Sequence, residues 1–108
     1  MPKIIYNNII PFKGFIAMNF FGIIFIRNEY KNYRYLQRTI NHELIHTAQM
    51  KELFYIGFYI LYFLEWIFNL IFHTKTAYRD ISFEKEAYDN ENDIDYLSYR
   101  EKFAMWKK

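Results

Sequence analysis

One long apolar stretch restricts how this chain can fold. Residues 53–72 read LFYIGFYILYFLEWIFNLIF, in which Glu65 is the single charged residue. A helix of this length and composition can cross a bilayer, but it can also be the core helix of a folded domain. Gly57 offers a point near its start where a helix can break. Which structure applies depends on the rest of the chain.

A second constraint lies just before this stretch, in residues 41–46, which read NHELIH. Histidines four residues apart lie on one face of a helix, so the imidazoles of His42 and His46 can reach one Zn²⁺. Glu43 stands off that face, where a carboxylate can hold and deprotonate a zinc-bound water without binding the metal. The alternative is a structural helix with two histidines, since chance produces this short pattern in roughly one of a hundred such chains.

The residues around the motif predict a helix from about Tyr33 to Leu53, with Asn32 as its N-cap. Apolar residues recur every four positions on a face away from the two histidines, at Leu36, Ile40, Leu44 and Ala48. Gln49 lies one turn beyond His46, where it either forms a hydrogen bond near the metal or is simply exposed.

The two constraints conflict if residues 53–72 span a membrane. Twenty helical residues rise about 30 Å, which would place the histidines and everything after residue 75 on opposite sides of the bilayer. A zinc site needs its third ligand within about 2 Å of the metal. We therefore expect a core helix packed antiparallel to the histidine helix. Its outer apolar face is then available for a membrane surface or for a second copy of the chain.

The first third of the chain predicts strands. Residues 3–10 are short and β-branched, and Pro11 interrupts them. The apolar run from Phe15 to Arg27 is divided by Asn19 and Gly22, which favours a hairpin or a bent strand pair over a single buried helix. With helices to follow, we expect an α+β fold in one domain that covers residues 1–108.

The last third predicts a helix that begins near Ser82, a residue type that favours the N-cap. Glu84 and Glu86 fall in its first turns, where the helix dipole favours acidic residues. The tail from Asn90 to Lys108 predicts one short helix and a wrapped terminus. Its expected buried residues are Ile94, Leu97, Phe103 and Trp106.

Composition excludes several classes of function. The chain has no cysteine, which rules out disulfides, thiolate zinc sites and thiol nucleophiles. Its net charge is +2 with both signs interspersed, so no basic patch indicates nucleic-acid binding. The first eight residues lack the layout of a signal peptide. We expect a cytoplasmic protein that is able to associate with a membrane through residues 53–72.

A catalytic zinc site needs three protein ligands and one open position for water and substrate. After the two histidines, the candidates for the third ligand are His73, Glu84, Glu86 and the acidic residues 89–95. Glu84 and Glu86 are two apart on a helix and point to nearly opposite sides, so only one of them can face the metal.

HELIH followed by Phe83-Glu84-Lys85-Glu86-Ala87 resembles the gluzincin class of zinc peptidases, which includes the CAAX-prenyl proteases and the repressor-cleaving phage regulators. In several branches the third ligand opens an E-x-x-A-D/N motif. The resemblance implies a minimal zincin-like domain, a short N-terminal hairpin or sheet followed by three to four helices. It implies that Zn²⁺ is held by His42, His46 and Glu84. Ala87 would allow close helix packing, and Tyr88 departs from the usual Asp or Asn.

The chain also resembles small bacterial zinc-peptidase-like proteins that have an A-M-N-x-F strand, here residues 17–21, before the histidine helix. The activity implied is hydrolysis of a peptide or protein substrate with Glu43 as the catalytic residue. Tyr78 and Tyr88 are the candidates to stabilise the oxyanion, and the strand edge at residues 14–20 is a candidate peptide-binding edge. The alternatives are a zinc-stabilised binding module without activity and a small membrane-associated protein.

Overall fold

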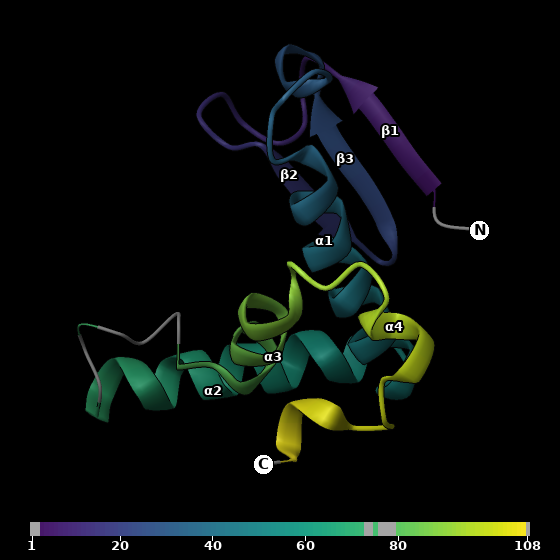
Figure 1. Ribbon diagram of the computed structural model, residues 1–108. Coiled ribbons are helices and arrows are strands. Elements are labelled where there is room, and N and C mark those ends of the chain that lie inside the picture. The colour runs from purple at the N-terminus through teal and green to yellow at the C-terminus, as the bar shows by residue number, and fades with distance from the viewer. Residues whose placement is uncertain (1–2, 73–74, 76–79, 108) are drawn as a thin grey trace.

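The computed structural model describes residues 3–72, 75 and 80–107, which form a small sheet with helices beside and below it (Figure 1). The strands are β1 (Lys3–Asn7), β2 (Ala17–Phe20) and β3 (Ile23–Arg27). The α-helices are α1 (Leu36–Glu52), α2 (Ile56–Phe72), α3 (Ser82–Asn90) and α4 (Tyr96–Tyr99), and two 3-10 turns cover Asn28–Tyr30 and Ala104–Trp106. This arrangement confirms the predicted α+β class.

The predicted hairpin is present as β2 and β3. The two strands are antiparallel, and Phe21 and Gly22 between them both have positive φ, 53° and 91°. Positive φ at both central residues is the type I′ geometry, whose twist matches that of the flanking strands. β1 adds in parallel to the other side of β3, so the strand order is β1-β3-β2. Within the described residues, β2 therefore has one unpaired edge.

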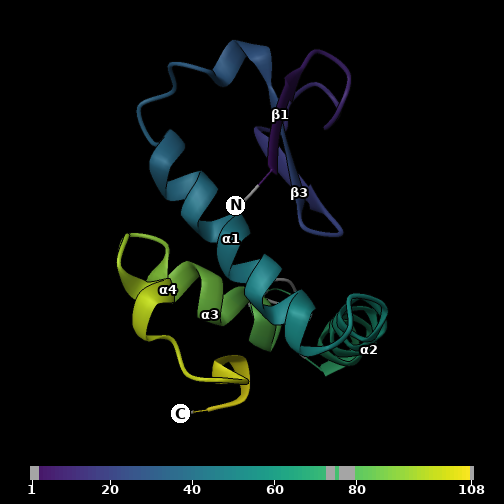
Figure 2. The same cartoon turned by 90° about the vertical axis from the view of Figure 1, so that its right-hand side faces the viewer.

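The described residues cover the sheet on one face only. Ile24 and Ile26 of β3 are fully buried on the face that meets α1. Asn19 of β2 fastens this contact, because its amide donates to the Glu43 carbonyl and to Thr47 Oγ1, both at 2.7 Å. The two views show α1 along this one side of the sheet (Figures 1 and 2). The histidine helix is thus anchored to an edge strand.

The predicted antiparallel packing of the two long helices is wrong. The axes of α1 and α2 meet at 109°, and Figure 2 shows α2 end-on while α1 runs across the view. The chain turns at Phe54 and Tyr55, which both have left-handed φ of 57° and 62°. The Tyr55 N–H donates to the Met50 carbonyl at 2.7 Å and closes the end of α1. Gly57, the expected break, lies inside the first turn of α2.

Among the described residues, one face of α2 joins the core. Phe58 packs with Met50, Ile81, Phe83 and Met105 in a buried cluster. The opposite face carries exposed apolar side chains along its length, at Ile56, Ile60, Phe63, Leu64, Phe68 and Ile71. Among the described residues, each helix alone falls short of the length and apolarity of a bilayer span, whereas α1 and α2 taken as one bent pair meet that criterion. The expected apolar outer face is therefore present.

Three local predictions need correction. α1 begins at Leu36 and has Tyr35 at its N-cap, because the preceding residues, Asn32 included, form turns. Ser82 is the first residue of α3 and Ile81 takes the cap position. In the tail, Tyr96 and Met105 are buried, whereas Ile94, Phe103 and Trp106 are exposed and Leu97 is half-buried. The tail therefore packs through Tyr96 and Met105, which lie between the residues that were predicted to be buried.

A carboxylate of α2 replaces the missing cap of α3. Glu65 accepts hydrogen bonds from the Ser82 N–H at 2.9 Å and from the Ser82 hydroxyl at 2.6 Å. It also places a negative charge at the N-terminus of α3, which the helix dipole favours. This contact sets the position of α3 relative to α2.

We predict that Glu65→Ala lowers the free energy of unfolding by about 1 kcal/mol, the usual cost of losing a helix cap. The measurement is a urea unfolding curve followed by circular dichroism. Glu101→Ala is the matched control, because its carboxylate is exposed and its ion pair with Lys107 lies at the surface. Equal losses in the two variants would contradict the capping role.

Candidate metal centre

α1 directs two histidines into the interior of the helical part. His42 and His46 are both buried, and their rings lie one turn apart with centroids 4.9 Å from each other. Gln49, one further turn along, is also fully buried. The helix therefore turns a polar stripe inward, which needs partners from other elements to offset the loss of hydration.

α3 supplies the partner. Glu84 Oε1 lies 3.2 Å from His42 Nε2 and 3.1 Å from His46 Nε2, and the Glu84 side chain is almost fully buried. The second carboxylate oxygen accepts a hydrogen bond of 2.6 Å from the Tyr62 hydroxyl of α2. The structure therefore brings together His42, His46 and Glu84, the three residues of the predicted ligand set.

These three side chains form a group that could hold a metal ion. One ligand atom from each lies within 4.8 Å of the other two. Two imidazole nitrogens and one carboxylate oxygen are a donor set that suits Zn²⁺ and other borderline divalent cations. Within the described residues, Glu86 and the acidic residues 89–95 contribute no atom to this group. His73 lies outside the described residues.

The electrostatics of this group favour a proton at the position that a metal would take. Burial alone would lower the pKa of His46, but the hydrogen bond and charge of Glu84, with Glu43 nearby, raise it to about 9. Burial would raise the pKa of Glu84, but hydrogen bonds from His42 and His46 hold it well below its usual range. A cation entering here would replace that proton.

Glu43 faces the cleft beside the group. It lines a cavity of about 250 Å³ together with His46 and Glu84, and with residues 17–19 of β2 on the opposite wall. Burial raises the pKa of the Glu43 carboxyl, against the opposing effect of the charges on His46 and His42. A carboxyl group with a raised pKa is better suited to take up and release a proton than one with the ordinary value.

Gln49 orients one of the two imidazoles. Its side-chain oxygen lies 2.8 Å from His46 Nδ1, and its amide nitrogen donates to the Phe83 carbonyl and to Glu86 Oε1. Because the amide nitrogen is committed to these acceptors, the oxygen must face His46 and accept from an Nδ1–H. With Nδ1–H held by Gln49, Nε2 is the nitrogen that donates its proton to Glu84 and that would bind a metal once this proton is lost.

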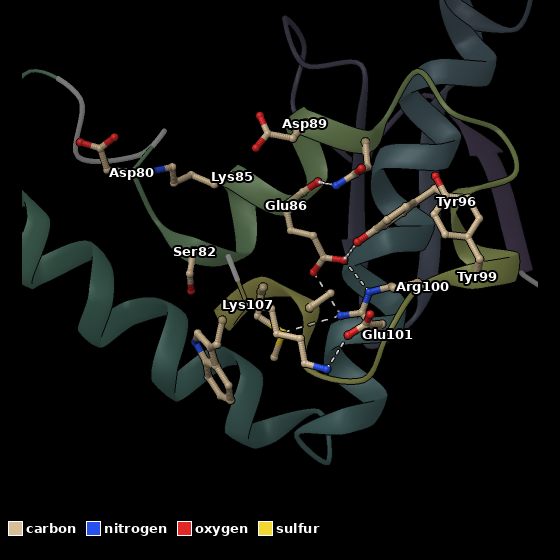
Figure 3. A pocket seen from close by; sticks show the side chains of 14 residues that line it. Asp80, Ser82, Lys85, Glu86, Asp89, Tyr96, Tyr99, Arg100, Glu101 and Lys107 are labelled. Carbon is tan, nitrogen blue, oxygen red and sulfur yellow. Dashed lines mark hydrogen bonds and ion pairs between the residues drawn. The ribbon is translucent and has the colours of Figure 1, made fainter.

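Glu86 has the opposite environment from the one its sequence neighbours predict. Its place beside Asn90 predicts a solvent-exposed carboxylate, yet only 6% of the residue is exposed. Figure 3 shows Tyr96 and Arg100 of the tail pointing toward it. Tyr96 donates to it at 2.6 Å and Arg100 at 2.5 Å. These contacts, with the Gln49 amide, outweigh burial and lower the pKa of Glu86.

Tyr88, where the gluzincin motif usually has Asp or Asn, contacts one of the two histidines. The Tyr88 ring packs edge-on against His42 with centroids 4.7 Å apart. A carboxylate oxygen of Glu91 lies 3.8 Å from His42 Nδ1 and takes the outer position toward this histidine. Ala87 is fully buried and packs against Ile45 of α1, which confirms its expected role in close helix packing.

Sequence reasoning missed two tyrosines of the cleft. Tyr59 and Tyr62 of α2 both line the cavity beside Glu43. Tyr88 contacts the far side of the site through His42, and Tyr78 lies outside the described residues. The one signal that could have identified Tyr62 is its place one turn from Phe58 on the buried face of α2.

Comparison of the chain with models of protein families, with curated proteins and with solved structures returned no match.

We predict that Glu84→Ala lowers zinc affinity by far more than a hundredfold, because it removes one of three ligands. Glu86→Gln should lower zinc affinity about tenfold, since Glu86 holds the glutamine that orients His46 and outer partners typically contribute 10–100-fold. Competition with a chromophoric chelator measures both, and Glu101→Gln is the exposed control. Parent-like affinity in Glu86→Gln would contradict the orienting role.

We also predict how the metal-free protein titrates. Because the folded-state pKa of His46 is about 9 and its ordinary value is 6.5, its contribution to stability is complete below pH 6.5 and is lost as the pH rises through 9. The imidazole signals of His46 in an NMR titration should follow the same midpoint. Glu84→Gln removes the charge that raises this pKa and should move the midpoint down markedly. An unchanged midpoint in Glu84→Gln would refute the assignment.

Proposed function

We propose that this chain is a zinc-dependent peptidase. The observation that supports the proposal most is the position of Glu43, which shares one cleft with His46 and Glu84, two of the three convergent donors, without belonging to the donor group. A purely structural zinc site is closed by a fourth ligand, whereas a catalytic site keeps a position open toward a cleft.

The donors and Glu43 have separate roles in the proposed reaction. A bound Zn²⁺ supplies a Lewis acid that polarises the scissile carbonyl and lowers the pKa of a water molecule. Glu43 accepts the proton of the attacking water as the C–O bond forms, and then passes it to the leaving amine as the C–N bond breaks. Gln49 keeps His46 in the tautomer that binds the metal.

The cleft also offers a place for the substrate backbone. Residues 17–19 of β2 form one wall, and the outer edge of β2 is unpaired within the described sheet. An extended peptide can add to such an edge through main-chain hydrogen bonds. Tyr59 and Tyr62 also line this cavity. Their hydroxyls donate to the Asn19 carbonyl and to Glu84, and either hydroxyl would serve a developing oxyanion once released from that acceptor.

The proposal predicts different outcomes for a substitution of the proposed base, Glu43, and for a substitution of a proposed metal ligand, His42. In Glu43→Gln we expect zinc content close to that of the parent and a loss of hydrolysis of at least about 10²-fold, because the amide cannot accept the water proton. In His42→Ala we expect loss of both zinc and hydrolysis. Metal analysis of the purified protein and cleavage of a mixed peptide library measure the two properties.

Two other outcomes would redirect the assignment. A fully zinc-loaded parent that cleaves no peptide would indicate the alternative, a zinc-stabilised binding module. Equal zinc loss in Glu43→Gln and His42→Ala would remove Glu43 from its catalytic role.

A further inference from the structure

The face of the sheet that points away from α1 contains an apolar groove of about 610 Å³. Its floor is formed by Met18 and Phe20 of β2 and by Phe25 of β3, and its rim by the segment from Ile9 to Phe15. Each described residue that lines the groove is apolar. The volume exceeds that of one aromatic side chain and lies within the roughly 300–1,000 Å³ of typical ligand sites.

The rim is held in place by hydrogen bonds. The Asn7 side chain bonds the backbone of Ile9 and Ile10 at its start. The buried Arg27 donates to the Pro11 carbonyl at 2.8 Å, and the Phe15 N–H donates to the Phe12 carbonyl at 3.1 Å. Nevertheless, 82% of Phe12 is exposed. A fastened backbone that holds large apolar side chains in water indicates a surface that is covered on binding.

β2 connects this groove to the metal-site cavity. In the register of the hairpin, Met18 lies opposite Phe25 on the open face, whereas Asn19 lies opposite Ile24 on the face toward α1. Ala17 and Met18 line both the groove and the cavity that contains Glu43. Since side chains alternate along a strand, a peptide added to the edge of β2 would direct every second side chain toward the groove.

We propose that the groove binds apolar side chains of the extended peptide that lies along β2. The peptidase would then select substrates with bulky apolar residues at alternate positions next to the cleavage site. A charged residue there would lose hydration without gaining a partner, because the lining offers no polar group. This inference rests on the proposed function, since the occupant is the peptide that the site would hydrolyse.

The test compares labelled peptides of otherwise polar sequence that carry two leucines, two glycines or two aspartates, placed two positions apart. Binding to the full chain is measured by fluorescence anisotropy with Zn²⁺ present, using Glu43→Gln so that the peptides stay intact. We expect the leucine peptide to bind at least about tenfold more tightly than the other two, because two buried leucines add substantial apolar area.

Two groove variants and one control make the test specific. Phe12→Ser and Phe20→Ser should each remove most of the preference for leucine. Phe63→Ser on α2 is the matched control, because 57% of Phe63 is exposed compared with 52% of Phe20, and it lies outside the groove. Equal binding of the three peptides, or a preference that survives in both groove variants, overturns the inference. Self-association of the parent that Phe20→Ser abolishes also overturns it, by assigning the groove to a second copy of the chain.

Hydrolysis by the zinc-loaded parent, measured on the same peptides, separates the two proposals. Selective binding without any cleavage overturns the peptidase assignment and supports the groove as a peptide site. Cleavage at equal rates for the three peptides supports the peptidase assignment and overturns the groove.

Discussion

The interaction on which the helical part depends is the contact of one buried carboxylate with two imidazoles. Glu84 Oε1 lies within 3.2 Å of both His42 and His46, and this contact joins α3 to α1. A buried carboxylate is tolerated only with a compensating charge and filled hydrogen bonds. Here a proton on His46 supplies that charge, and the Tyr62 hydroxyl satisfies the second oxygen and adds α2 to the contact. A divalent cation would compensate the negative charge of Glu84 more fully than a single proton does.

A second set of polar contacts connects His46 to the C-terminal tail. His46 is held by Gln49, Gln49 by Glu86, and Glu86 by Arg100, which also bonds Glu52 at 2.9 Å. Each side chain in the series is oriented by the next, so the tail contributes to the geometry of the site although it supplies no ligand. Such networks are strong only when every member has a partner, and among the described residues no buried side-chain polar atom lacks one.

The apolar side chains are less completely covered than the buried polar groups are satisfied. In the part of the chain that the structure describes, α1 covers one face of the sheet and the core covers one side of α2, so two apolar surfaces are exposed. One of them lies beside the cleft and shares residues with it. The other runs along α2, on the far side of the core cluster. Association of α2 with a membrane surface or with a second copy of the chain stays a prediction.

The sequence by itself determined the features that depend on spacing along one element. The helical period places His42 and His46 on one face, and the two-residue separation of Glu84 and Glu86 allows only one of them to reach that face. The hairpin follows from Gly22, which accepts the positive φ that the tight turn requires. These are local properties, and neighbouring residues are sufficient to specify them.

Tertiary structure decided the features that depend on residues far apart. Phe54 and Tyr55 adopt the left-handed backbone conformation, which the sequence does not predict for aromatic residues. The resulting turn directs α2 away from the antiparallel packing that was expected. Glu86 is buried because Arg100, fourteen residues later, folds back to neutralise it. Gln49 and Tyr62 gain their roles only when α1, α2 and α3 meet. Burial, charge pairing and the choice of hydrogen-bond partner are properties of the packed chain, so spacing along the sequence cannot specify them.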